Sequence, residues 1–136
     1  MAAAAESKNF VLLNRLMTLV GIFFFGGASI FHGLAFFFPN ISEPQPPWMH
    51  VTFFAVNLFF ALAFVFKLPR VGWPFLALTI QQLWQHGGDI ERALKEQPPH
   101  IDSQSVFALF GLSLVWLLLW ARARAQTQPP AQSAAT

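Results

Sequence analysis

An uncharged apolar stretch, residues 16–38, constrains the fold of this chain more than any other feature. It reads LMTLVGIFFFGGASIFHGLAFFF and contains no Asp, Glu, Lys or Arg. Crossing the ~30 Å hydrocarbon layer of a membrane takes about 20 predominantly apolar residues in a helix. Inside lipid a single segment must satisfy its own backbone hydrogen bonds, which only a helix can do. The stretch therefore predicts a transmembrane helix.

The same stretch has some features of a secretory signal peptide. Gly26, Gly27 and Ala28 are small residues of the kind found at a signal cleavage site. The apolar run continues to Phe38, however, and the apolar core of a signal peptide is only about 7–15 residues long. We therefore expect the segment to be retained as a membrane span.

The composition of the whole chain agrees with a membrane protein. Of 136 residues, 55% are hydrophobic and 10% are charged, whereas charged residues make up about 25% of a typical soluble domain. The chain has seventeen Phe and five Trp but no Tyr, which is more apolar aromatic surface than a water-soluble fold of this size could bury. The absence of Cys excludes disulfides, thiolate metal sites and cysteine nucleophiles.

Three further segments have span-like length, and one of them is weaker than the others. Residues 48–66 and 103–120 are mostly apolar and contain no Asp, Glu, Lys or Arg, but residues 71–88 are apolar only as far as Ile80 and then continue through QQLWQHGG. Glutamines are uncharged, and neighbouring helices can satisfy them in lipid. We therefore predict an all-α polytopic fold, an up-down four-helix transmembrane bundle over residues 15–121. A cytoplasmic segment, 1–14, would precede it, and a disordered cytoplasmic tail, 122–136, would follow.

The basic residues of the chain segregate by side in this topology. With the N-terminus inside, the inner side holds Lys8, Arg15, Lys67, Arg70, Arg122 and Arg124, and the outer side holds only Arg92 and Lys95. This bias follows the positive-inside rule, so both termini are expected to be cytoplasmic in a bacterial inner membrane. Because these few charges sort by membrane side, the pI of about 9.7 does not indicate nucleic-acid binding.

Polar residues recur at helical spacing in the outer half of the predicted bundle. Gln82, His86 and Asp89 lie at i, i+4 and i+7, with Gln81 and Gln85 beside them. The other helices carry the pairs His50–Asn57 and Ser29–His32. Lipid cannot satisfy such groups, so they are expected to turn inward and contact one another.

This convergence predicts a metal or small-ligand site. His32, His50 and His86 would be metal ligands, with Asp89 as a fourth ligand or as the carboxylate that orients an imidazole. Imidazole ligands suit a divalent zinc, copper or iron ion. Haem is a variant, with His32 and His86 as the axial pair. Ser29, Asn57, Gln82 and Gln85 would be the ligand-binding residues around the histidines.

Three alternatives remain open from the sequence. A small membrane enzyme could use His86 and Asp89 for acid–base chemistry on a lipid-like substrate. An accessory subunit would pack its Phe-rich faces on membrane-protein partners or on a second copy of the chain, in addition to membrane lipids. Finally, the polar residues could serve only as hydrogen bonds between helices. No phosphate-binding loop, dinucleotide fingerprint or HExxH motif occurs in the sequence.

Overall fold

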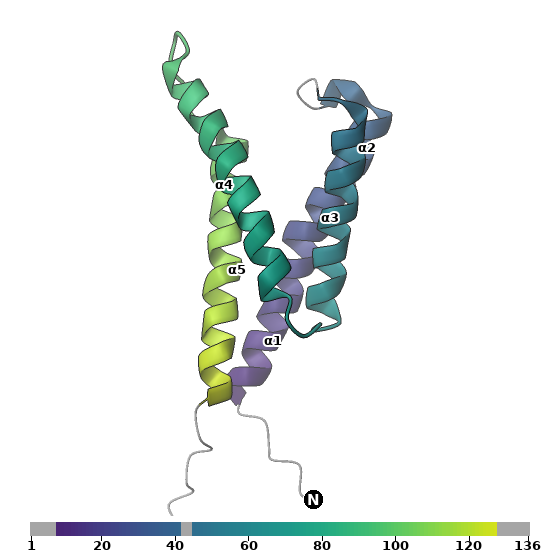
Figure 1. Ribbon diagram of the computed structural model, residues 1–136, viewed down its shortest axis with the longest axis vertical. Helices are drawn as coiled ribbons and strands as arrows, with labels where there is room; N and C mark the ends of the chain where they lie inside the picture. Colours follow the sequence, from purple (N-terminus) through teal and green to yellow (C-terminus); the bar gives the residue numbers. More distant parts are fainter. Residues whose placement is uncertain (1–7, 42–44, 128–136) are drawn as a thin grey trace, which may run out of the picture.

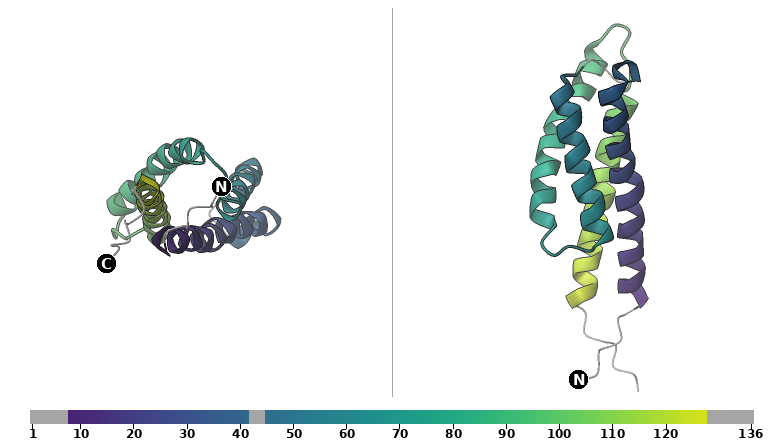
Figure 2. Two further views of the ribbon diagram at one scale, coloured as in Figure 1. Left: turned by 90° about the horizontal axis from the view of Figure 1, so that it is seen from below. Right: turned by 90° about the vertical axis from the view of Figure 1, so that its right-hand side faces the viewer.

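The computed structural model describes residues 8–41 and 45–127, and the regular structure in these residues is entirely helical (Figure 1). The first long helix has three sections: α1 (Lys8–Val20), the π-helical η1 (Gly21–Gly26) and α2 (Gly27–Phe37). A short 3-10 turn, η2 (Pro39–Ile41), follows. The remaining helices are α3 (Pro47–Val65), α4 (Gly72–Lys95) and α5 (Ser103–Thr127). Successive long helices run in opposite directions along the long axis (Figures 1 and 2).

Three of these helical segments are long and apolar enough to cross a membrane. They are Phe10–Phe37, Pro47–Val65 and Ser103–Thr127. The all-helical fold predicted from the sequence is thus confirmed, with three helices of membrane-spanning character. The fourth predicted span, 71–88, falls in α4, which is not among them. The 24 residues of α4 are long enough to cross a membrane. Its glutamines and its charged C-terminal turns, however, make it less hydrophobic than the other three segments.

Three helices extend further than the sequence indicated: the first begins at Lys8 rather than near residue 16, and two continue past their predicted ends. The paired glycines Gly87 and Gly88 do not end α4, which continues to Lys95. Ion pairs along this last part, Arg92 with Asp89 and Lys95 with Glu91, have the i, i+3 and i, i+4 spacings that support a helix. The predicted disordered tail begins as helix, because α5 includes residues up to Thr127. Residues 1–7 and 128–136 lie outside the described part of the chain.

The core is a cluster of aromatic rings contributed by every long helix. Phe25 of η1 lies with its ring centroid 5.5 Å from those of Phe60 and Phe64 in α3. Phe75 of α4 is 6.0 Å from Phe25 and 5.2 Å from Trp116 of α5, and none of its side chain is exposed. These five residues form what we call the aromatic hub. Phe64 ends α3 and Phe75 begins α4, so the hub lies towards the end of the molecule that carries the described part of the N-terminus (Figure 1).

Two glycines allow helices to approach closely. A Cβ atom added to Gly21 would lie 2.7 Å from Cβ of Phe64, and one added to Gly111 would lie 2.0 Å from the ring of Phe24. Three other glycines of this first long helix, Gly26, Gly27 and Gly33, differ in their surroundings. Of these, only Gly33 faces another helix, with Phe54 3.3 Å from such a Cβ. Helical period alone could not reveal this, since the π-helical turn changes which residues share a face.

Candidate functional site

The first polar cluster joins α2 to α3. The Nδ1 atoms of His32 and His50 are 3.2 Å apart, so one ring carries its proton on Nδ1 and donates it to the other. His50 is buried, and the half-buried ring of His32 stacks on Phe53 with centroids 5.2 Å apart. One turn before His32, the hydroxyl of Ser29 donates to the carbonyl oxygen of Phe54 at 3.0 Å. The predicted pairing of polar residues on the first two long helices is therefore present.

The second polar cluster joins α4 to α5. Nδ1 of His86 lies 2.8 Å from Oγ of Ser105, and its Nε2 lies 3.0 Å from Oε1 of Gln82. The hydroxyl of Ser105 donates in turn to Oδ2 of Asp102 at 2.6 Å. Asp102 also caps α5, because its Oδ1 accepts the backbone N–H groups of Gln104 and Ser105. The Ser105 hydroxyl and these N–H groups hold the pKa of Asp102 below its ordinary value.

Glutamine side chains extend the second cluster along α4. Nε2 of Gln82 donates to Oε1 of Gln81 at 2.6 Å, and Nε2 of Gln81 donates to Oε1 of Gln85 at 2.8 Å. Together with His86, Ser105 and Asp102, they make a continuous hydrogen-bonded chain. These glutamines were expected to bond to neighbouring helices, but the partners found for them lie on α4 itself. Side chains three or four residues apart on one helix are already within reach of each other.

This hydrogen-bonded chain can hold His86 in two protonation states. Ser105 has one hydroxyl proton, which it gives to Asp102, so Nδ1 of His86 must be the donor to Ser105. As the Gln82 amide is placed, Nε2 of His86 must donate as well, which requires an imidazolium. If the Gln82 amide is turned by half a rotation, its NH2 group donates to Nε2 of His86, and the ring is then neutral. Turning the amides of Gln81 and Gln85 in the same way keeps every hydrogen bond of the chain. The arrangement can therefore hold His86 either protonated or neutral, with the three amides turned one way or the other.

The remaining predicted site residues have other partners. Oδ2 of Asp89 is 3.8 Å from Nδ1 of His86, which is an electrostatic contact rather than a hydrogen bond, and its Oδ1 accepts from Arg92. The orienting role expected for Asp89 belongs to Ser105 and Asp102. Asn57 donates to the carbonyl oxygen of Phe53 on its own helix. Neither Asp102 nor Ser105 was among the site residues predicted from the sequence.

The predicted metal centre is not assembled in the part of the chain that the structure describes. His32 forms a hydrogen bond with His50, whereas His86 forms its hydrogen bonds with Ser105 and Gln82. No group of three or more His, Asp or Glu side chains there is close enough to hold a metal ion. Both ring nitrogens of His86 are engaged by Ser105 and Gln82, which leaves none for a haem iron. Nε2 of His32, in contrast, has no hydrogen-bond partner among the described residues.

Comparison with known proteins adds no relative: no family model, characterised protein or solved structure matches the chain. Function is therefore inferred from the residues and their geometry.

Proposed function

We propose that the chain is an integral protein of a bacterial inner membrane with four transmembrane helices and both termini in the cytoplasm. The packing of the three apolar helices supports the fourth crossing. α3 ends beside α1, whereas α5 begins at the opposite end of the molecule and ends beside α1 (Figure 1). If α3 and α5 both span, the chain must cross between them, and α4 is the segment available. At 1.5 Å per residue its length is about 36 Å, sufficient for a ~30 Å layer.

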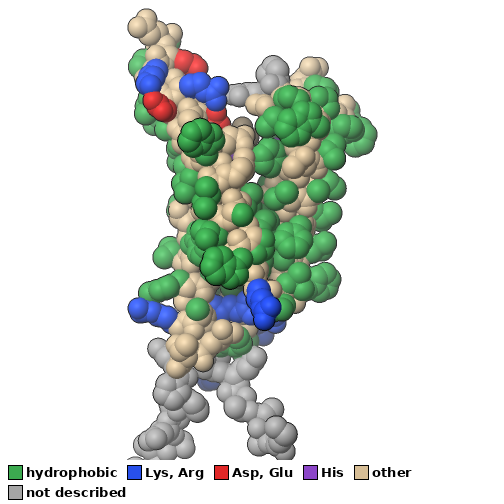
Figure 3. Space-filling view, viewed as in Figure 1, with side chains coloured by type: hydrophobic (Ala, Val, Ile, Leu, Met, Phe, Trp, Pro, Cys, Tyr) green, Lys and Arg blue, Asp and Glu red, His purple; other side chains and the backbone are tan. Residues whose placement is uncertain are grey.

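The distribution of charge supports the orientation. Among the described residues, the end that holds the N-terminal helix carries Lys8, Arg15, Lys67, Arg70, Arg122 and Arg124 and no carboxylate. The described carboxylates gather at the other end with Arg92 and Lys95 (Figure 3). Basic residues in short loops are retained on the cytoplasmic side of the membrane. The carboxylate-free end is accordingly assigned to the cytoplasm.

Cysteine labelling distinguishes this topology from one with three spans. The chain has no natural Cys, so Gln97→Cys and Gln126→Cys each introduce a single reactive thiol. With four spans, an impermeant maleimide added outside intact cells labels Gln97→Cys and leaves Gln126→Cys unlabelled until the membrane is opened. With three spans, α4 stays inside and the two results are exchanged. Gln45→Cys, which both topologies place outside, is the positive control.

We further propose that the outer half of this bundle binds a small molecule with a hydrogen-bonding head group, between His32 and His86. The observation that carries this proposal is that two separate helix pairs, α2 with α3 and α4 with α5, each hold a hydrogen-bonded histidine, His32 and His86. A hydrogen bond orients each ring: His50 holds His32, and Ser105 holds His86. His32 retains an Nε2 atom for a ligand, and the glutamine chain lets His86 donate or accept. Pockets of this kind combine apolar walls with a few fixed polar groups.

A ligand accounts for this geometry better than the other functions considered. A metal ion would need a third close ligand beside His32 and His50, and the described residues supply none. Acid–base chemistry by His86 and Asp89 has less support, because Nδ1 of His86 and Oδ2 of Asp89 are 3.8 Å apart and Oδ1 of Asp89 accepts from Arg92. Purely structural hydrogen bonding would give no role to Nε2 of His32, which has no partner among the described residues.

Retention of a bound molecule tests the ligand proposal. The parent and the His32→Ala, His86→Ala and His100→Ala variants would be purified in mild detergent, extracted with organic solvent and compared by mass spectrometry. A molecule present in the parent and in His100→Ala, but lost from the other two, is the expected result. His100 is the matched control because its exposed ring contacts Glu96 outside the site. Metal analysis of the same samples shows whether an ion is lost instead. Equal contents in all four proteins would contradict the proposal.

A further inference from the structure

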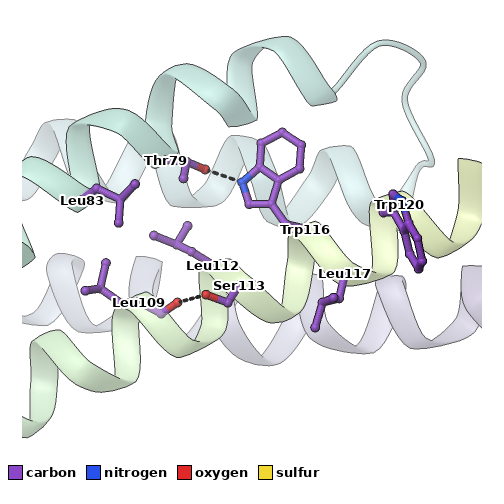
Figure 4. Close-up of a pocket in the computed structure, with 8 residues that line it drawn as sticks. All are labelled: Thr79, Leu83, Leu109, Leu112, Ser113, Trp116, Leu117 and Trp120. Carbon is purple, nitrogen blue, oxygen red and sulfur yellow. Dashed lines mark hydrogen bonds between the residues drawn. The ribbon is translucent and has the colours of Figure 1, made fainter.

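An apolar groove runs between α4 and α5, and no histidine is among the residues that line it. It encloses about 700 Å³. Its floor includes Leu112 and Trp116, and the exposed side chains of Leu83, Leu117 and Trp120 form its edges (Figure 4). The indole Nε1 of Trp116 donates to Oγ1 of Thr79 across the floor at 2.9 Å, which fixes the large ring and joins the two helices. The floor of the groove is therefore formed by a direct contact between α4 and α5.

The length of the groove matches one leaflet of a bilayer. On α5 its lining runs from Leu109 to Trp120, which at 1.5 Å per residue is roughly 16 Å. Half of a hydrocarbon layer is about 15 Å thick. Trp120 lies at the end nearer the charged C-terminal turn, where Trp side chains commonly mark the membrane–water interface. A single acyl chain would thus fill the groove from the interface to the midplane.

A basic side chain, that of Arg124, lies at the end of the groove that carries Trp120. Arg124 follows Trp120 by one turn of α5, and its guanidinium lies 4.1 Å from the centroid of the Trp120 ring. No carboxylate in residues 8–41 and 45–127 pairs with Arg124. The charges at this end of the described chain are all basic (Figure 3). Such an end is complementary to an anionic head group and not to a zwitterionic one.

We propose that this groove is a specific site for an anionic phospholipid of the cytoplasmic leaflet. One acyl chain lies along Leu112 and Trp116, and the phosphate contacts Arg124. The site is separate from the proposed histidine site, and it places the lipid in the opposite half of the membrane. Its assignment to the cytoplasmic leaflet rests on the proposed orientation, but lipid binding itself does not.

Quenching of tryptophan fluorescence by brominated lipids tests this site. Trp48, Trp73 and Trp84 are exposed and would be replaced by Phe, which leaves Trp116 and Trp120 as the fluorophores. The full chain is reconstituted in nanodiscs that contain a small fraction of phosphatidylglycerol or phosphatidylcholine with brominated acyl chains. Because both leaflets have the same composition, the measurement does not depend on orientation. We expect about fivefold higher apparent affinity for the anionic lipid, the effect of one basic residue near the surface.

Three variants make the result decisive. Arg124→Gln should abolish the preference for the anionic lipid, and Arg92→Gln, at the other end of the molecule, should leave it unchanged. Ser113→Phe fills the groove and should reduce quenching by both lipids. It should fold normally, since the Ser113 hydroxyl bonds only the carbonyl of Leu109 on its own helix. Equal affinity for the two lipids in the parent, an undiminished preference in Arg124→Gln, or full quenching in Ser113→Phe would each overturn the proposal.

Discussion

Replacing Phe75 by Ala should destabilise the protein by about 3 kcal/mol, near the lower end of the values known for buried Phe. Phe75 is the only hub residue of α4, and its ring contacts rings from η1, α3 and α5. Removing it leaves a cavity at the place where the helices meet. Lipid is as apolar as the side chain, so the loss comes from packing rather than from exposure to water. The expected destabilisation is therefore near the lower end of the range measured for Phe→Ala substitutions in protein cores.

The measurement is reversible unfolding in mixed micelles, with Phe23→Ala as the control. Phe23 is 77% exposed, whereas Phe75 is 0% exposed, so the two substitutions remove the same atoms from different surroundings. The control should unfold within about 0.5 kcal/mol of the parent, as is usual for surface positions. A Phe75→Ala protein as stable as the control would show that the hub does not hold the helices together.

Replacing Gly21 by Ala should destabilise the protein by about 1–3 kcal/mol, although it adds a single methyl group. The new Cβ would lie 2.7 Å from Cβ of Phe64. A Cβ atom cannot rotate away, so the first long helix and α3 would have to move apart. That movement would loosen the contacts of Phe25 with Phe60 and Phe64 in the hub.

Gly27→Ala provides the comparison for this second substitution. Gly27 is also helical, but no atom lies within 4 Å of a Cβ added there. Alanine at such a position should be neutral or should stabilise the helix by up to about 1 kcal/mol. Both variants would be unfolded by the same method as Phe75→Ala. If Gly21→Ala were as stable as Gly27→Ala, the close approach of the two helices would not be a constraint on the fold.

The sequence predicted the features that depend on local composition. The apolar run 16–38 and the proline-rich break after Phe38 were sufficient for the first helix and its end. Helical spacing also placed Ser29 with His32, and Gln82 with His86, on common faces. The pairing of His32 with His50 followed from antiparallel packing of consecutive helices, which brings the outer ends together.

Features that depend on distant contacts could not be predicted in this way. Seventeen Phe residues look alike in the sequence, and only the packing of four helices selects Phe75 as the most buried. The partner of His86 proved to be Ser105, whose position depends on how the loop before α5 folds around Asp102. The spacing of the histidines likewise could not show that a hydrogen bond joins His32 to His50 but not to His86.

The position of the aromatic hub has a mechanical consequence. The hub binds all four long helices towards one end, whereas nearer the other end α2 packs on α3 and α4 packs on α5 as separate pairs. A small rotation of one pair about the hub therefore changes the spacing between His32 and His86 most, while the contacts of Phe75 change least. In the proposed membrane topology, the two helix pairs would act as a lever that pivots at the hub, so that lateral pressure near the hub would change the width of the proposed histidine site.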